Sequence, residues 1–226
     1  DPVTKYPTIH ASSLKGALRE HFEGVFGENS QEVNTIFGKE AKNNEESASG
    51  DFKFFGADLV AFPVRSNYKQ FSLTVSTDSM KLVNNKSSLL TGHHIFNQQG
   101  NSDRFFSALP PSYDVYLEDH LFIKESIVPL LNCSGIDCFS DRYAIAEESK
   151  FGYFVKNLPV IARNQLNNGI SKNLWYEEVV PHQSIFITFI ASTSSYFNVF
   201  EQELLKEGKT IQIGGNASVG YGICKF

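Results

Sequence analysis

Two adjacent carboxylates are the side chains of this sequence whose types and setting suggest acid–base or metal chemistry. Glu177 and Glu178 follow Trp175 and Tyr176, and Pro181 comes shortly after them. This setting predicts that at least one carboxylate is presented from a restricted loop near an aromatic surface. Such a carboxylate can bind Mg²⁺ or act as an acid or base in phosphodiester transfer. An acidic pair is also common at a solvated edge, and residue type alone leaves both interpretations open.

Four glycines frame a short loop between two apolar, strand-like runs near the C-terminus. They are Gly214, Gly215, Gly220 and Gly222. Glycine has no Cβ and tolerates positive φ, so such a loop can present bare backbone N–H groups to phosphate or ribose. A dinucleotide-binding fingerprint must instead open a helix, and the four residues after Gly222 do not provide one. A plain β-hairpin turn stays open as the alternative.

Ser12, Ser13 and Lys15 stand at the start of the most regular helical pattern, which predicts a helix over residues 12–26 with a serine N-cap. Its apolar residues recur at helical spacing as Leu14, Leu18, Phe22 and Val25. The free N–H groups and the positive end of the dipole at such an N-terminus attract phosphate, and Lys15 adds a charge. Capping serines with a solvated lysine are the alternative.

Arg65 and Ser66 directly follow the apolar run 59–64, which predicts a strand. A guanidinium offers a fork of donors that suits phosphate. An exposed arginine at the end of a strand is equally ordinary, so these two residues are candidate phosphate contacts and no more.

The order of the remaining patterns predicts an α+β fold. Residues 71–75 alternate as a strand with one wet face, and residues 113–118 and 121–123 form a possible strand pair. A largely buried strand is expected over 183–191, followed by a helix over 197–207 that ends at Gly208 and by a final hairpin. Residues 29–50 indicate an exposed polar loop, and irregular insertions are expected over much of 76–175.

Composition limits the function classes. The chain has 226 residues, of which 41% are hydrophobic, as expected for a soluble protein with an ordinary core. Its net charge of −5 argues against coating nucleic acid by bulk electrostatics, so an RNA or DNA site must be local. No apolar run approaches a membrane span, and no membrane partner is expected. The odd cysteine count, from Cys133, Cys138 and Cys224, fits a reducing cytoplasm.

Four segments agree with one family in their order along the chain. They are Tyr6-Pro7 with residues 12–16, then residues 59–66, residues 174–181 and the glycine-framed loop. Together they resemble the RAMP superfamily of CRISPR proteins, which act in antiviral defence. Within it, the chain is most similar to the repeated backbone subunit of type III-B (Cmr) effector complexes.

This resemblance implies a fold and its landmarks. The expected architecture is a single domain over residues 1–226 with a ferredoxin-like palm, related to the RNA-recognition motif. Insertions are expected at about 28–52 and 76–175, including a thumb-like β-hairpin. The family's first strand and its catalytic Asp are expected upstream of Asp1.

The resemblance also implies partners and roles. Such subunits stack with their own copies along a CRISPR guide RNA, beside other effector subunits, and cut the paired single-stranded target RNA with a divalent metal, here expected to be Mg²⁺. It favours guide contacts at Ser12, Ser13, Lys15, Gly214, Gly215, Gly220 and Gly222, and Arg65 and Ser66 stay candidate RNA contacts from their residue types. Of the carboxylates Glu177 and Glu178, it favours Glu177 as catalytic.

Two alternatives stay open beside that function. The first is a structural RNA-binding subunit without catalysis, which the acidic net charge supports. The second is a metal-independent endonuclease that processes CRISPR RNA with a histidine base, although His94 and His182 have no recognisable partner spacing.

Overall fold

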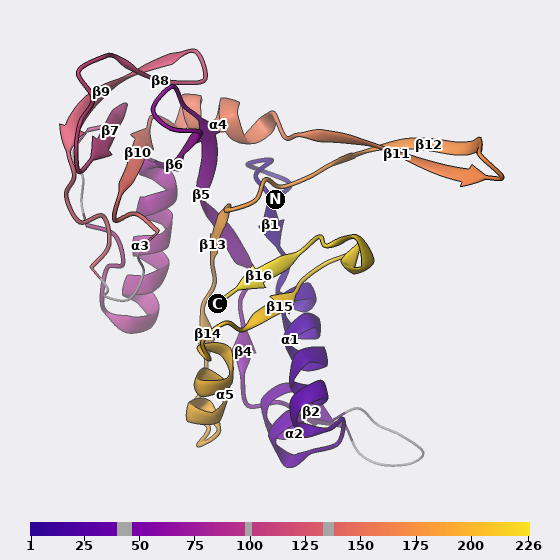
Figure 1. Ribbon diagram of the computed structural model, residues 1–226. Coiled ribbons are helices and arrows are strands. Elements are labelled where there is room, and N and C mark those ends of the chain that lie inside the picture. The colour runs from indigo at the N-terminus through magenta and orange to yellow at the C-terminus, as the bar shows by residue number, and fades with distance from the viewer. Residues whose placement is uncertain (40–46, 98–100, 133–137) are drawn as a thin grey trace. The chain divides into compact units, whose positions relative to one another are not determined.

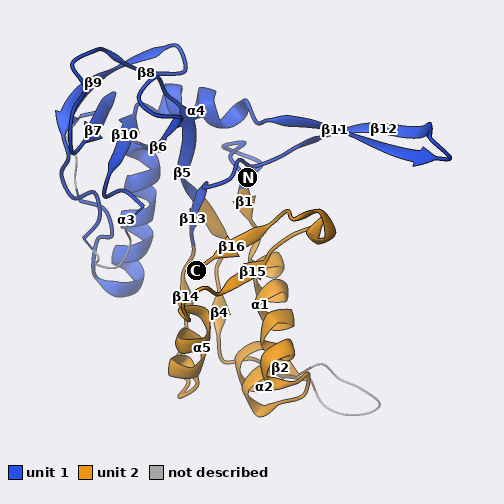
Figure 2. Cartoon of the chain, in the orientation of Figure 1, with its two compact units in different colours: residues 1–7, 59–187 blue, residues 8–58, 188–226 orange. Residues whose placement is uncertain are grey.

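The structure is a computed structural model that describes residues 1–39, 47–97, 101–132 and 138–226 (Figure 1). The chain forms two compact units (Figure 2). Unit 1 comprises Asp1–Pro7 and Leu59–Ile187, and unit 2 comprises Thr8–Asp58 and Thr188–Phe226. Cys133, from the cysteine count, lies outside the described residues. Within the described ranges, no helix combines the length and the apolar character needed to cross a bilayer.

Unit 1 is built on a mixed sheet that curls back toward its own first strand. In spatial order its strands are β5 (Ala57–Arg65), β6 (Phe71–Ser76), β10 (Arg142–Ala146), β7 (Arg104–Ser107), β9 (His120–Ser126) and β8 (Val115–Leu117). Neighbouring strands are antiparallel, except that β6 runs parallel to β10 and β7 runs parallel to β9. An antiparallel bridge from Ser66 to Leu117 brings the last strand to the end of β5. β13 (Ile185–Ile187) also pairs with β5.

Two helices, α3 (Thr77–Thr91) and α4 (Glu148–Lys156), pack against β6. The hydroxyl of Ser76 caps α3 by accepting a hydrogen bond from the Ser79 N–H at 2.9 Å, and Gly92 ends that helix with φ +76°. Helix α4 supplies aromatic and aliphatic side chains to a core shared with the strands. The core includes Phe151, Phe154, Val155, Leu59, Phe62, Val64, Phe105, Val115, Leu117 and Phe122.

A long hairpin projects from unit 1 as two exposed strands, β11 (Val160–Asn167) and β12 (Ile170–Glu178) (Figure 1). Asn168 and Gly169 make its turn with φ values of +51° and +80°. Two successive positive φ values are what a tight hairpin turn requires, which explains the Asn-Gly pair. The family resemblance implies a projecting thumb-like hairpin; the observed hairpin spans residues 160–178 and therefore runs past the expected insertion over 76–175.

Unit 2 packs three helices and short strands around an aromatic core. The helices are α1 (Ala11–Phe26), α2 (Gln31–Phe37) and α5 (Phe197–Leu204). The short strands are β1 (Thr8–Ile9), β2 (Gly38–Lys39), β3 (Ala48–Ser49), β4 (Lys53–Phe54), β14 (Ile190–Ala191), β15 (Thr210–Gln212) and β16 (Ile223–Lys225), with a 3₁₀ turn at Ala217–Val219. The rings of Phe22 and Phe200 stack at 5.1 Å between centroids, and Phe37 stacks on Phe54 at 5.3 Å.

Several expectations are confirmed, beginning with the mixed α+β class. Strands occupy residues 57–65 and 71–76, the pair β8–β9 forms as expected, and the chain closes with the β15–β16 hairpin. Leu14, Leu18 and Phe22 are buried on α1, whereas Val25 is exposed. The ferredoxin-like topology, the insertion boundaries and the upstream strand stay predictions.

Other expectations were wrong. Residues 31–37 are a helix with Val33, Ile36 and Phe37 buried, although residues 40–46 of the expected loop lie outside the described residues. Residues 76–175 contain regular helices and strands instead of irregular insertions. The polar side of β6 is buried, because α3 and α4 both pack against this strand.

Two C-terminal elements are also shorter than expected. The strand expected over 183–191 is broken into β13 and β14, both only half buried. Helix α5 ends at Leu204, before the expected stop at Gly208, and its C-cap is Leu205.

Candidate nucleic-acid interface

Helix α1 begins without a side-chain cap. It starts at Ala11, and its N-cap His10 makes no capping hydrogen bond. Ser12 and Ser13 therefore lie inside the first turn and are exposed, so the predicted serine N-cap was wrong. The first N–H groups of an α-helix have no partner within the helix. The free N–H groups that a helix start provides, two exposed serines and the half-buried Lys15 make this N-terminus suited to phosphate.

The four glycines of the terminal loop play different structural parts. A Cβ at Gly222 would lie 2.1 Å from the carbonyl oxygen of Ile213, and Gly222 has φ +71°, so the hairpin itself requires this glycine. Gly214 and Gly220 also have positive φ, at +92° and +82°, but open space surrounds the position of their Cβ atoms. Gly215 has neither a positive φ nor a neighbour within 4 Å. Local geometry therefore explains every glycine of the loop except Gly215.

The glycine loop and helix α1 belong to the same packed body. Strand β15 packs on α1, and Ile211 and Ile213 share a buried cluster with Leu14 and Leu18. The carbonyl of Gly222 accepts a hydrogen bond from the Ile213 N–H at 2.8 Å, which closes the neck of the loop. The strand that supports the loop therefore lies against the first helix.

Glu177 lies on a strand, not on the restricted loop that the sequence predicts, because β12 continues to Glu178. The Glu177 carboxylate has two neighbours on the hairpin. Its Oε1 accepts a hydrogen bond from the Trp175 indole N–H at 2.8 Å, and its Oε2 lies 2.9 Å from Arg163 Nε. The hairpin therefore holds this carboxylate in a fixed direction.

The two carboxylates of the pair face opposite sides of the hairpin. Glu177 is opposite Ile161 and Glu178 is opposite Val160 in the register, and successive strand residues alternate between faces. Glu178 is exposed. One carboxylate is therefore held by Arg163 and Trp175, and the other points away from that contact.

The residues described here do not by themselves fit a divalent cation. Both oxygens of Glu177 already have partners, and the described ranges contain no group of three or more His, Cys, Asp and Glu side chains arranged around a metal. A cation at Glu177 would have to displace Arg163 or recruit ligands from elsewhere. The predicted Mg²⁺ stays untested by these positions.

Arg65 and Ser66 lie where the curled sheet of unit 1 closes. The Arg65 side chain is 77% exposed, and its Nη2 donates to Glu118 Oε2 at 2.7 Å. The Ser66 hydroxyl accepts a hydrogen bond from the Tyr68 N–H at 3.0 Å. A phosphate at Arg65 would therefore compete with Glu118, a partner that sequence reasoning missed.

Tyr6, from the first motif, has a structural role within unit 1. Its hydroxyl donates to Glu148 Oε1 at 2.5 Å, and its ring packs edge-on against Phe151. Burial and then the neighbouring Glu148 raise the pKa of this phenol. A Cβ at Gly152 would lie 3.2 Å from the Tyr6 hydroxyl oxygen, so a small residue is favoured there.

The predicted residues thus form two groups. Unit 2 carries Ser12, Ser13, Lys15 and the glycine loop, and unit 1 carries Arg65, Ser66, Glu177 and Glu178. Sequence reasoning missed Arg163, which binds Glu177. The Asn168-Gly169 turn could have revealed this contact, because a hairpin paired around that turn places Arg163 opposite Trp175, near Glu177.

Comparison with known proteins gives relatives over nearly the whole chain. The chain is 26% identical over 250 residues to the CRISPR system Cmr endoribonuclease Cmr4 of Pyrococcus furiosus, covering 98% of this chain and 83% of that protein. It is also 26% identical over 264 residues to the CRISPR system CMR subunit Cmr4 of Saccharolobus solfataricus, covering 98% of this chain and 84% of that protein.

Solved structures share the fold. A type III-B Cmr-beta chain, from a complex bound to cognate target RNA, aligns with a TM-score of 0.73 at 21% identity, covering 96% of this chain and 83% of that chain. Oligomeric Cmr4 from Pyrococcus furiosus aligns with a TM-score of 0.70 at 24% identity, covering 98% and 86%. The family model of the RAMP superfamily matches residues 1–225. This chain therefore belongs to the RAMP superfamily.

Proposed function

We propose that this protein is the backbone subunit of a type III-B CRISPR effector and binds the guide RNA through unit 2. The observation that carries the proposal is the packing of β15, which supports the side-chain-free glycine loop, against helix α1 with its uncapped, exposed N-terminus. The names of the two Cmr4 relatives support the same assignment.

The contacts would be made to the sugar-phosphate backbone. Helix N–H groups and Lys15 offer positive charge to a phosphate, and the loop offers backbone that a strand can approach closely. Such contacts position a nucleic acid without reading its sequence, so base pairing between guide and target would supply specificity. The net charge of −5 is consistent with a local site.

We extend the proposal to cutting of the paired target RNA, as a metal-dependent endoribonuclease. The support is the name of the Pyrococcus relative, an endoribonuclease, together with the fixed carboxylate of Glu177. A carboxylate held in one direction can accept a proton from an attacking hydroxyl, and a nearby guanidinium can stabilise developing negative charge. The divalent cation would supply further charge stabilisation when bound, with ligands beyond those described here.

Partners follow from the same assignment. Copies of this chain would stack in a filament along the guide, beside other effector subunits, and the similarity to oligomeric Cmr4 of Pyrococcus furiosus supports self-assembly. The exposed hairpin carries large apolar side chains that suit contact with RNA or a neighbouring subunit. They are Leu166, Ile170, Leu174, Trp175 and Tyr176.

A non-catalytic backbone subunit is the second candidate, and one observation favours it. Both oxygens of Glu177 are engaged by Trp175 and Arg163, which is also what a purely structural carboxylate would show.

Incubating the assembled complex with matched target RNA, with and without EDTA, separates the functions. Regularly spaced cuts that need the metal support the endoribonuclease. Tight guide binding without cuts supports the structural subunit, and metal-independent cutting of repeat RNA would instead indicate a guide-processing enzyme. Failure to bind guide RNA in any assembly contradicts the proposal as a whole.

A further inference from the structure

Unit 1 contains a cavity whose lining includes Arg65 but none of the other residues with a predicted guide-binding or catalytic role in the favoured function. Its volume is about 520 Å³, and its walls come from the end of β5, the start of β6, helix α4 and the segment after β12. Pockets of this size accommodate small organic ligands. Two aromatic side chains that are not buried, Phe71 and Tyr153, line it together with polar groups from Gln70, His182 and Gln183.

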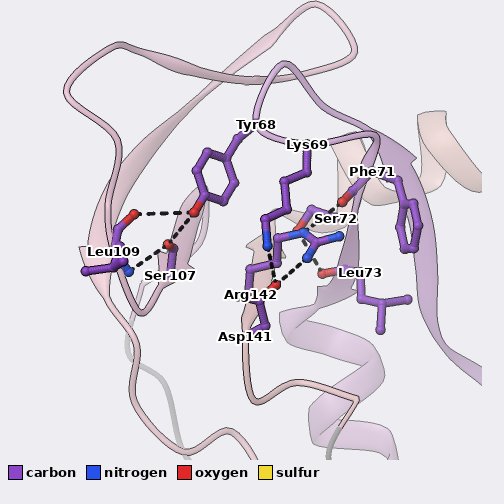
Figure 3. Close-up of polar contacts among 9 residues, drawn as sticks. All are labelled: Tyr68, Lys69, Phe71, Ser72, Leu73, Ser107, Leu109, Asp141 and Arg142. Carbon is purple, nitrogen blue, oxygen red and sulfur yellow. Dashed lines mark hydrogen bonds and ion pairs between the residues drawn. The ribbon is translucent and has the colours of Figure 1, made fainter.

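The Phe71 wall is held in place from outside the cavity. The Arg142 guanidinium lies 5.4 Å from the centroid of the Phe71 ring, and its Nε donates to the Phe71 carbonyl at 3.0 Å. Asp141 binds Arg142 and also Lys69, whose Nζ lies 2.9 Å from the carboxylate (Figure 3). These contacts fix the aromatic surface before any ligand arrives, which reduces the entropic cost of binding.

The second aromatic, Tyr153, is 55% exposed, so part of its surface is open to a ligand. Its ring packs edge-on against Phe154, with centroids 6.0 Å apart, and against His120, at 5.7 Å. The cavity therefore offers accessible aromatic surface from two different elements, Phe71 at the start of β6 and Tyr153 on α4.

The charges at the cavity favour a neutral ligand. Arg65 and Glu118 both line it, and they form an ion pair with each other at 2.7 Å. In a site built for a bare anion, the guanidinium would be free to bind the ligand, whereas Arg65 is already neutralised by Glu118. An inorganic phosphate is therefore a poor fit to this lining.

Three neutral polar side chains of the lining have no hydrogen-bond partner in the described part of the chain, unlike Arg65, Glu118 and Asn157. Within the described residues, the side chains of Gln70, His182 and Gln183 make no hydrogen bond. A carboxamide both donates and accepts, so it can pair with the edge of a heterocycle that carries both kinds of group. Aromatic walls, amide edges and balanced charge together describe a site for a neutral, planar heterocycle.

We propose that this cavity binds one unstacked nucleobase. The base would lie against Phe71 or Tyr153, with its edge toward the glutamine amides and its phosphate outside. The inference rests on the proposed function where the base belongs to bound RNA. A free nucleotide offers the same chemistry, and the test separates these two sources.

The test uses two probes on the full chain and its variants. The first probe is AMP, followed by saturation-transfer NMR on the base protons. The second is a single-stranded RNA with one 2-aminopurine, whose fluorescence reports stacking, and its counterpart with an abasic site at that position. Tyr153→Ala removes one aromatic wall. Tyr116→Ala is the matched control, because Tyr116 is 41% exposed on β8 and does not line the cavity.

We expect Tyr153→Ala to weaken binding of the probe by roughly 10-fold, the scale of one base–aromatic stack, and Tyr116→Ala to leave it unchanged. Phe71→Leu tests the other wall, and circular dichroism shows whether each variant is folded. If the cavity variants bind AMP more weakly than the parent but bind the 2-aminopurine RNA equally well, the ligand is a free nucleotide. If the cavity variants bind the 2-aminopurine RNA more weakly than the parent, and the parent binds the abasic strand more weakly than the 2-aminopurine strand, the ligand is an RNA base.

The proposal is overturned if Tyr153→Ala and Phe71→Leu are both folded and bind AMP and the 2-aminopurine RNA as tightly as the parent. If RNA binding is otherwise normal, that result leaves the proposed function intact. If the parent chain alone binds no RNA, guide binding in the assembled complex decides the proposed function, and the AMP titration alone decides the cavity.

Discussion

Arg163 Nε lies 2.9 Å from Glu177 Oε2 across the β11–β12 hairpin, so the favoured carboxylate is already ion-paired on an exposed ribbon. The adjacent Glu178 faces the other side of the same strand and takes no part in this pair. The two carboxylates cannot substitute for each other in one geometry. This difference lets single substitutions test the proposed catalytic role of Glu177 separately from Glu178.

The first prediction compares the two carboxylates. In the assembled complex, Glu177→Ala should slow target cleavage by about 10²–10⁴-fold, the usual loss for an acid–base group, while guide binding stays near that of the parent. Glu178→Ala is the matched control and should retain the rate. Single-turnover cleavage at saturating and limiting Mg²⁺ measures both. An unchanged rate in Glu177→Ala would leave the ion pair with Arg163 as a structural contact of the hairpin.

The second prediction concerns Lys15. Lys15→Ala should weaken guide binding and reduce the slope of log K against log salt by roughly one phosphate contact. Lys81→Ala is the control, because Lys81 is an exposed lysine on α3 with a local partner, Asp78. Binding isotherms across a salt series measure the slope. Equal slopes for the parent and both variants would remove Lys15 from the interface.

The third prediction separates binding from folding within the glycine loop. Gly215→Val should leave the fold intact, because open space surrounds that position, and should weaken guide binding by obstructing approach of the RNA. Gly222→Ala should instead destabilise the protein, by about 1–3 kcal/mol from its positive φ alone and by more from the contact with Ile213. Urea unfolding and guide titration distinguish the two effects. A folded Gly215→Val variant that binds guide normally would reduce the loop to a turn.

The fourth prediction is a pH dependence of stability in unit 2. His21 Nε2 and Lys209 Nζ lie 3.0 and 2.7 Å from Glu203 Oε1. Burial raises the pKa of Glu203, but the hydrogen bonds from Lys209 and His21 outweigh it, and the pKa falls below its ordinary value of 4.5. A carboxylate with a lowered pKa contributes stability that is present above about pH 4.5 and is lost as the pH falls through its folded-state pKa.

Glu203→Gln should therefore flatten the fall in stability below pH 4.5, whereas Glu207→Gln, at an exposed carboxylate, should not. Urea unfolding at a series of pH values from about 6 to 3 gives the comparison. Curves for Glu203→Gln and the parent that fall in parallel would show that this cluster makes no net contribution to acid sensitivity.

The sequence predicts elements well where burial follows apolar residue type. Helix α1 shows Leu14, Leu18 and Phe22 at helical spacing, and strand β5 is a continuous apolar run. Helix α3 was not predicted in this way, because two of its four buried residues are polar. Asn84 is buried and holds the backbone of Ile95 and Phe96 through three hydrogen bonds, a tertiary role that residue type does not reveal.

The candidate site divides in the same way. The position of the α1 N-terminus, to within one residue, and the open glycine loop follow from local sequence, although the predicted serine cap does not form. The partners of Arg65 and Glu177 could not be predicted so directly. Glu118 reaches Arg65 only because the sheet curls, and Arg163 reaches Glu177 only through the hairpin register.

Ultraviolet cross-linking of guide RNA in the assembled complex, followed by mass spectrometry of the protein, tests the central claim most directly. If unit 2 holds the guide backbone, cross-linked peptides should include residues 11–19 and 210–225, and Lys15→Ala together with Gly215→Val should diminish them. Cross-links that arise from unit 1 alone, with neither of those segments labelled, would contradict the proposed guide-binding surface.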